Sequence, residues 1–315
     1  MAGHESNRVV IAALAGNILV TATKLGAALV TGSSAMLSEA VHTAADTGNE
    51  LLLLYGMRRA ARPADADHPF GHGRELFFWS FVVAILVFAL GAGVSLYEGV
   101  HHLRHPVPIT HPIVNYVVLA LALVFEGGSW WVAFSSLRAA RGGRGYLEAI
   151  RQSKDPTTFT VLAEDTGAVL GIVIAFVGTL SSTVLHRPVL DGAASLAIGV
   201  LLGLIAFLLA RETKSLLIGE PARSELVSSI CALASRQAGV DRSNGLFTVH
   251  IGPRQVVAAL SVEFEDSLTA SAVETIVADL EDEVRRIHPE VVSLLVKPQR
   301  SDRADFRLPP SEEEG

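Results

Sequence analysis

The chain has 315 residues, of which 50% are hydrophobic and only 18% are charged. A soluble domain carries about a quarter charged residues, so this composition, with a mean hydropathy of +0.42, excludes an ordinary soluble protein and indicates an integral membrane protein. The net charge of −7 comes wholly from the residues after Gly219. The chain is therefore expected to have two regions with different surroundings.

Stretches of about 20 apolar residues predict membrane-spanning helices. Four are plain: Val9–Thr31, Leu76–Tyr97, Pro112–Leu137 and Val189–Ala210. Two further segments bring the expected number to six: Thr157–Leu185, which Glu164 and Asp165 interrupt, and Ala35–Met57, the second along the chain. The second contains Glu39, His42, Asp46 and Glu50, so the other helices must shield it from lipid. Arginine and lysine concentrate in the loops after the second and fourth helices, which predicts that both termini lie on the cytoplasmic side.

After Lys214 the sequence is typical of a small soluble α+β module. The expected order is helix, two strands, helix and strand: Ser224–Gln237, Leu246–Ile251, Val256–Glu263, Ala270–Ile287 and Val291–Val296. This order predicts an open sheet with helices on one face. The chain then divides into a six-helix transmembrane domain (residues 1–215), a cytoplasmic α+β domain (216–300) and a disordered acidic tail (301–315).

The first candidate metal site is centred on His42 and Asp46, which share one face of the second helix. Ionisable groups at membrane depth are costly and usually line a path for ions or protons. Zinc takes about four N, O or S ligands, and Glu164 and Asp165 of the fifth helix could supply the remainder. Asp165 is preferred, because neighbours on a helix point about 100° apart. The alternative is that these groups only hydrogen-bond between helices.

The second candidate site is Asp65, His68 and His72, in the loop after the second helix. The ProPheGly sequence between the histidines predicts a turn that brings them together. The alternative is a turn and cap at the start of the third helix, with Arg74 paired to a carboxylate.

Other polar residues of the spans and their loops are open to two interpretations. The sequence HisHisLeuArgHisPro at 101–106, followed by His111, could catch an ion at the exit, but a solvated loop is favoured. Lys24 is expected to snorkel to the interface or to pair with an acid. Glu126 faces either the bundle or a partner on the lipid side.

Several motifs resemble those of the cation diffusion facilitator family. They are GlySerSerAlaMetLeuSerGluAlaValHis at 32–42, AspHisProPheGlyHisGlyArgGlu at 67–75, and LysAspProThr at 154–157 followed by LeuAlaGluAspThrGlyAlaValLeuGly at 162–171. The last two are most similar to the zinc transporter nine-like branch. The resemblance covers nearly the whole chain, and it implies six transmembrane helices with a cytoplasmic module of the ferredoxin-like metallochaperone type.

The resemblance implies a metal–proton antiporter, not an enzyme, with no permanent cofactor. His42, Asp46 and Asp165 match the family's transport-site ligands. Val161 stands where the family often has a histidine, so Glu164 or water would complete the site. Zinc is the expected ion, with manganese, iron or cobalt as alternatives, because an oxygen-rich ligand set is less selective. Asp65, His68 and His72 match the family's loop site.

The resemblance also implies a homodimer. Arg74 stands where the family has a basic residue that pairs with an acid at the base of the sixth helix and stabilises the dimer, and Glu220 is the nearest candidate for that acid. The cytoplasmic domain lacks the family's ligands near Ser261 and Val296, which predicts dimerisation without tight metal sensing. The expected surroundings are membrane lipid, in the bacterial inner membrane, with no nucleic-acid partner. Two other classes stay open: a non-transporting metal sensor or scaffold, and an intramembrane metalloenzyme, although a HisGluXxxXxxHis helix is absent.

Overall fold

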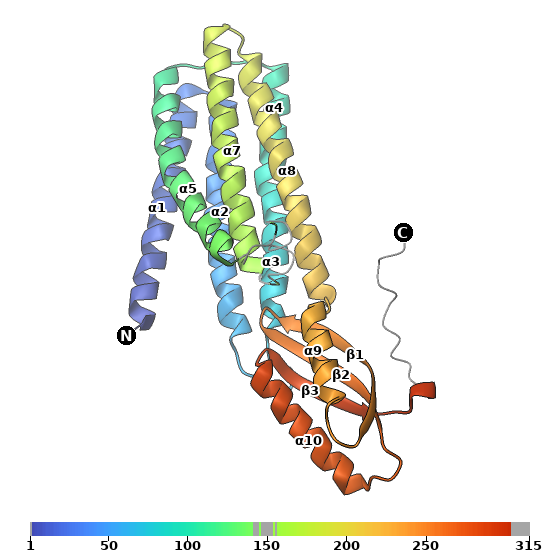
Figure 1. Ribbon diagram of the computed structural model, residues 1–315. Helices are drawn as coiled ribbons and strands as arrows, with labels where there is room; N and C mark the ends of the chain where they lie inside the picture. Colours follow the sequence, from blue (N-terminus) through green and yellow to red (C-terminus); the bar gives the residue numbers. More distant parts are fainter. Residues whose placement is uncertain (1, 141–144, 146–153, 155, 304–315) are drawn as a thin grey trace. The chain divides into compact units, whose positions relative to one another are not determined.

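The computed structural model describes residues 2–140, 145, 154 and 156–303 (Figure 1). The chain forms two compact units. One takes the chain up to Arg59 together with Glu75–Lys214, and the other takes Ala60–Arg74 together with the chain from Ser215 onwards. The loop between the second and third predicted spans therefore belongs to the second unit, which the division drawn from the sequence did not anticipate.

The first unit is built from long helices, one at each of the six predicted apolar segments (Figure 1). They are α1 (Ala2–Thr31), α2 (Ser34–Ala60), α3 (Arg74–Leu86) continued by a π-helical segment η1 (Val87–Ala92) and α4 (Gly93–Arg104), α5 (Pro112–Ala140), α7 (Pro156–Val184) and α8 (Val189–Ile218). Within the described residues, four helices are long and apolar enough to cross a membrane: Arg74–Arg104, Pro112–Ser135, Phe159–Val184 and Val189–Ile218.

The start of α2 is fixed by Asp191, the third residue of α8. The buried carboxylate of Asp191 accepts hydrogen bonds from the backbone N–H of Ser34 (2.7 Å) and of Ala35 (3.3 Å), and from the hydroxyls of Ser33 and Ser34 (2.8 and 2.9 Å). An acid at a helix N-terminus satisfies unpaired N–H groups and complements the helix dipole. This contact sets the register of the helix that carries His42 and Asp46.

Glycines allow α4 and α8 to approach closely. A Cβ atom on Gly199 would lie 2.8 Å from the backbone nitrogen of Leu96, and one on Gly99 would lie 2.6 Å from the backbone nitrogen of Leu196. Small residues at helix interfaces permit such backbone contact in membrane proteins. The two helices are therefore held against each other along much of α4.

The second unit contains a three-stranded sheet in the order β1-β2-β3, formed by Val240–Gly252, Gln255–Phe264 and Val291–Pro298. β1 and β2 are antiparallel, and β2 and β3 are parallel. Helices α9 (Ser224–Ala234) and α10 (Ala270–Ile287) share one hydrophobic core with the sheet, which includes Ile230, Leu260 and Leu280. The predicted order and one-sided packing are thus observed.

Several boundaries of the second unit differ from the expectation. Helix α9 ends at Ala234 and not at Gln237, and β3 ends at Pro298 and not at Val296. β1 begins at Val240, six residues before the predicted start at Leu246. Irregularities at Val240/Arg242 and Ser243/Gly245 break the alternation of apolar and polar residues, so the pattern did not indicate this part of the strand. Ser301–Arg303 forms a short 3₁₀ turn, and the rest of the predicted acidic tail lies outside the described residues.

Candidate functional site

His42 and Asp46 lie one turn apart on α2, inside the helical unit. The Nδ1 atom of His42 is 3.4 Å from Oδ1 of Asp46, and the His42 side chain is 1% exposed. Both ring nitrogens of His42 and Oδ1 of Asp46 are buried without a hydrogen-bond partner. Buried polar atoms nearly always have partners, and leaving them unpaired is costly. This pair is therefore a site that a ligand could complete.

Helix α7 packs against this face of α2 through two glycines. A Cβ atom on Gly167 would lie 3.7 Å from Nε2 of His42, and one on Gly171 would collide with the carboxylate of Glu39. The two helices named in the sequence hypothesis are therefore in contact at the level of His42.

The adjacent acids of α7 point in different directions. Glu164 accepts a hydrogen bond from Asn49 of α2 (2.7 Å), whereas Asp165 accepts one from Ser129 of α5 (3.0 Å). This divergence is the one expected for neighbours on a helix. Glu164 thus faces the helix that carries His42, and Asp165 faces α5.

Position 161, where a histidine could have supplied a further ligand, is apolar in its contacts. Val161 packs against the buried cluster of Leu53, Val83, Val87 and Ala206. In the part of the chain that the structure describes, His42, Asp46, Glu164 and Asp165 do not form a group with ligand atoms within 4.8 Å of one another; two other groups do.

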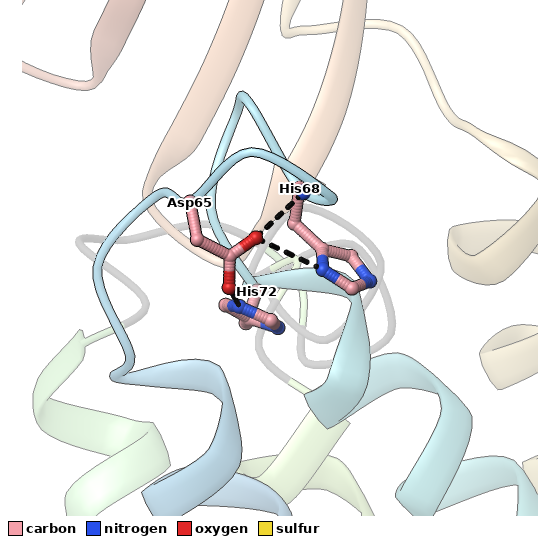
Figure 2. A group of neighbouring side chains, drawn as sticks. All are labelled: Asp65, His68 and His72. Carbon is pink, nitrogen blue, oxygen red and sulfur yellow. Dashed lines mark hydrogen bonds and ion pairs between the residues drawn. The ribbon is translucent and has the colours of Figure 1, made fainter.

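The first of these groups is Asp65, His68 and His72 (Figure 2). One carboxylate oxygen of Asp65 lies 2.9 Å from Nε2 of His72, and the other lies 3.3 Å from Nδ1 of His68. The backbone N–H of His68 also donates to Asp65 (2.7 Å). The loop therefore brings together the three side chains that the sequence singled out. The second group, Glu98, His101 and His102, lies on α4.

Electrostatics of the loop group favour a charged carboxylate. The hydrogen bond from His72, followed by that from the His68 backbone, lowers the pKa of Asp65 from 3.8 to about 2. His72 is 6% exposed and its Nδ1 atom is buried without a hydrogen-bond partner, while Asp65 and His68 are exposed. An ionised oxygen and two imidazoles are suitable ligands for a transition metal.

The loop is anchored to the sheet of the second unit. A Cβ atom on Gly73 would collide with the carbonyl oxygen of Ile251 and the side chain of Gln255, and would lie 3.1 Å from the Cα atom of Gly252. Gly73 is therefore required where the loop meets the β1–β2 turn. On β2 of the second unit, the Ser261 hydroxyl accepts a hydrogen bond from Asn244 and donates one to Gln299, so its hydrogen bonds are those of a structural residue.

Lys24 is the centre of a buried group of charged residues whose members the sequence did not identify. Its fully buried ammonium donates to Glu126 of α5 (2.7 Å), and to Thr43 and Glu39 of α2 (2.8 and 3.2 Å). Lys24 therefore pairs with acids, and Glu126 faces the bundle. In the sequence, Lys24 is a single cation in an apolar segment, and such a charge must find acidic or polar partners inside the bundle. The sequence does not identify those partners.

Comparisons with known proteins agree with one another. A family model described as the cation efflux transmembrane domain matches residues 10–218. The human protein described as "proton-coupled zinc antiporter SLC30A9, mitochondrial" is 34% identical over 261 residues, covering 82% of this chain and 46% of the relative. Metal tolerance protein C4 of Arabidopsis thaliana is 31% identical over 267 residues, covering 84% and 58%.

A bacterial relative matches over nearly its whole length. The cation-efflux pump FieF of Escherichia coli O1:K1 / APEC is 26% identical over 288 residues, covering 91% of this chain and 90% of the relative. The chain spans about half the length of the human relative.

Proposed function

The chain belongs to the cation efflux family, the cation diffusion facilitators, in its zinc transporter nine-like branch, and we propose that it carries a divalent metal cation across a membrane in exchange for protons. Zinc is the first candidate ion, and manganese, iron and cobalt are the alternatives. The observation that carries this proposal is the set of unpartnered, buried ligand atoms of His42 and Asp46 against α7.

The proposed transport site joins α2 to α7. His42 and Asp46 provide a nitrogen and an oxygen from α2, and Asp165 provides an oxygen from α7. Glu164 or water takes the place that Val161 leaves, because Val161 packs into an apolar cluster. A cation would have to draw Asp165 from Ser129, or Glu164 from Asn49, in order to gather these ligands. The resulting nitrogen and oxygen set suits zinc but also other first-row metals.

Exchange for protons follows from the ligand chemistry. A metal binds a neutral imidazole and ionised carboxylates, so binding releases protons and protonation releases the metal. If the same site is exposed alternately to the two sides of the membrane, this competition couples metal movement to proton movement in the opposite direction. No group outside the site is needed for the coupling.

The placement in the membrane is part of the same proposal. We place all six long helices across the bilayer, with α1 and α2 shielded by the more apolar helices, and both termini in the cytoplasm of a bacterium. The arginine-rich loops support this orientation, and the match to a bacterial cation-efflux pump over 90% of its length supports a bacterial setting. The human relative's description, by contrast, places that protein in mitochondria. Residues 141–144, 146–153 and 155, which include part of the second basic loop, lie outside the described residues.

The remaining parts of the proposal concern the second unit. Residues 216–300 form the dimerisation domain of a homodimer, with Arg74 and Glu220 as a predicted stabilising pair. Asp65, His68 and His72 form a loop site for the same class of cation, supported by their mutual distances. A non-transporting sensor and a membrane metalloenzyme are less well supported, since the relatives' descriptions are those of an antiporter and an efflux pump.

The test is ion exchange by the full chain in proteoliposomes. Addition of zinc outside vesicles with an acidic interior is expected to raise the internal pH, reported by a trapped dye, as zinc enters. The same assay with manganese, iron, cobalt and cadmium, in wild type and in Val161→His, ranks the ions; the added imidazole is expected to favour zinc. Zinc entry without any pH change would contradict the exchange, and the absence of entry for every ion would contradict transport.

A further inference from the structure

The last two turns of α4 carry Glu98, His101 and His102, whose ligand atoms all lie within 4.8 Å of one another. Glu98 precedes His101 by three positions and His102 by four, so each histidine is a neighbour of Glu98 on the helix surface. The two adjacent histidines leave the helix about 100° apart, yet their ring centroids are only 5.9 Å apart. Nδ1 of His102 is 3.6 Å from Oε2 of Glu98, and it is buried without a hydrogen-bond partner. We infer that this group is a binding site for a divalent transition-metal cation of the zinc class.

The donor set has the chemistry of an open zinc site. Two imidazoles and one carboxylate are a frequent set of three protein ligands, with the fourth position left to water or to a mobile group. His105 lies one turn further along, and its ring centroid is 5.1 Å from that of His101. Either His105 or water would complete four-coordination. Magnesium is disfavoured, because it prefers oxygen ligands in an octahedral arrangement.

Packing against α8 fixes the backbone beneath this site. A Cβ atom on Gly192 would lie 2.9 Å from Cβ of His102 and 3.0 Å from the backbone nitrogen of Leu103. The hydroxyl of Ser195 donates to the carbonyl oxygen of Ser95 (3.0 Å). The site therefore rests on a rigid helix pair, and only side-chain rotations are needed to close it around an ion.

The expectation of a solvated loop for this histidine cluster is wrong for its first two members, because α4 continues to Arg104. The side chains of Glu98 and His102 are 20% and 13% exposed, so an ion from solution can reach them. Glu98 lies 23 residues beyond Glu75 on the continuous helical segment Arg74–Arg104, about 35 Å along its axis at 1.5 Å per residue. The site is thus at the other end of this helix from Glu75.

Residue-resolved histidine modification tests the site without relying on transport. The purified full chain is treated with diethylpyrocarbonate, with and without zinc, and modification of each histidine is quantified by mass spectrometry. With zinc at about ten times its dissociation constant, mass action predicts roughly tenfold slower modification of His101. The protection is expected to disappear in Glu98→Gln, and magnesium should not replace zinc.

His186 is the matched control. It is exposed, lies in the loop between α7 and α8, and is not part of a described group of ligands. Its modification rate should not change with zinc, and His186→Asn, which suits the left-handed backbone there (φ 51°), should leave the protection of His101 intact. Equal protection of His101 and His186, or protection of His101 that survives Glu98→Gln, would overturn the inference. Because the readout is local, a failure here is distinct from a failure of transport.

Discussion

The ammonium of Lys24 lies 2.7 Å from Oε1 of Glu126, which joins α1 to α5 inside the helical unit. The same ammonium also contacts Glu39, one turn before His42 on α2. One buried cation thus connects three helices and partly balances two acids. This set of charges ties α1, α2 and α5 together next to His42.

Replacing Lys24 with methionine should destabilise the helical unit. Lys24→Met keeps the length of the side chain but leaves Glu39 and Glu126 buried without their counter-ion, and removing one partner of a buried ion pair costs about 3 kcal/mol or more. We expect a lower midpoint in thermal unfolding of the detergent-solubilised protein. The triple variant with Glu39→Gln and Glu126→Gln should recover much of the loss. A Lys24→Met midpoint equal to that of wild type would show that the pairing does not stabilise the bundle.

The contact between α4 and α8 can be tested with two glycines on the same helix. Gly199→Ala places a methyl group against the backbone of Leu96 and should cost about 1–3 kcal/mol, as overpacking does. Gly203→Ala is the matched control, because its Cβ atom would make an ordinary 3.7 Å contact with Ala92. It should be neutral or slightly stabilising, since alanine favours helices. Chemical unfolding of the two variants in detergent measures the difference, and equal stabilities would contradict the close packing.

Removing the cap of α2 should loosen the helix that carries the proposed transport site. Asp191→Ala deprives Ser34 and Ala35 of the acceptor for their backbone N–H groups, and loss of a helix cap typically costs about 1 kcal/mol. Hydrogen exchange at the first turn of α2 is expected to become faster, while exchange in the sheet of the second unit stays unchanged. Unchanged protection at Ser34 would mean that the carboxylate does not hold this end of α2.

The loop group predicts a specific dependence on pH. Because the pKa of Asp65 is lowered to about 2 from 3.8, its hydrogen bonds favour the ionised form. The contribution of these hydrogen bonds to the free energy of unfolding is therefore complete above about pH 4 and is lost as the pH falls towards 2. In His72→Ala, the main hydrogen bond is gone and the pKa of Asp65 should rise towards 3.8. Carbon-13 shifts of labelled aspartates follow this titration, with Asp67→Asn as the control that should leave Asp65 unchanged.

Much of the fold follows from local sequence pattern. Local pattern predicted helices at all six positions, although the segment that became α2 is only partly apolar. The alternation of apolar and polar residues predicted the three strands, and helical periodicity predicted the bounds Ala270–Ile287. Local pattern does not report irregular hydrogen bonding, so the π-helical segment at Val87–Ala92 and the early start of β1 were missed. Nor does it report tertiary placement, so the grouping of Ala60–Arg74 with the second unit was not foreseen.

The candidate sites were predictable to different degrees. Asp65, His68 and His72 are close in sequence, and the turn between them brings their side chains together. The partners of Lys24, Glu164 and Asp165 lie on other helices, with Glu126 102 residues from Lys24. The direction in which each side chain points depends on helix rotation, which hydropathy does not specify.

The central claim is that His42 and Asp46 form half of a transport site, and Asp46→Asn tests it most directly. The amide keeps the shape of the side chain but removes the charge that a cation needs. Zinc uptake into proteoliposomes with an acidic interior is measured for wild type, Asp46→Asn and the loop variant Asp67→Asn, with gel filtration to confirm equal folding. We predict uptake by wild type and Asp67→Asn, and no uptake above that of empty vesicles for Asp46→Asn. Wild-type uptake by a correctly folded Asp46→Asn would contradict the claim.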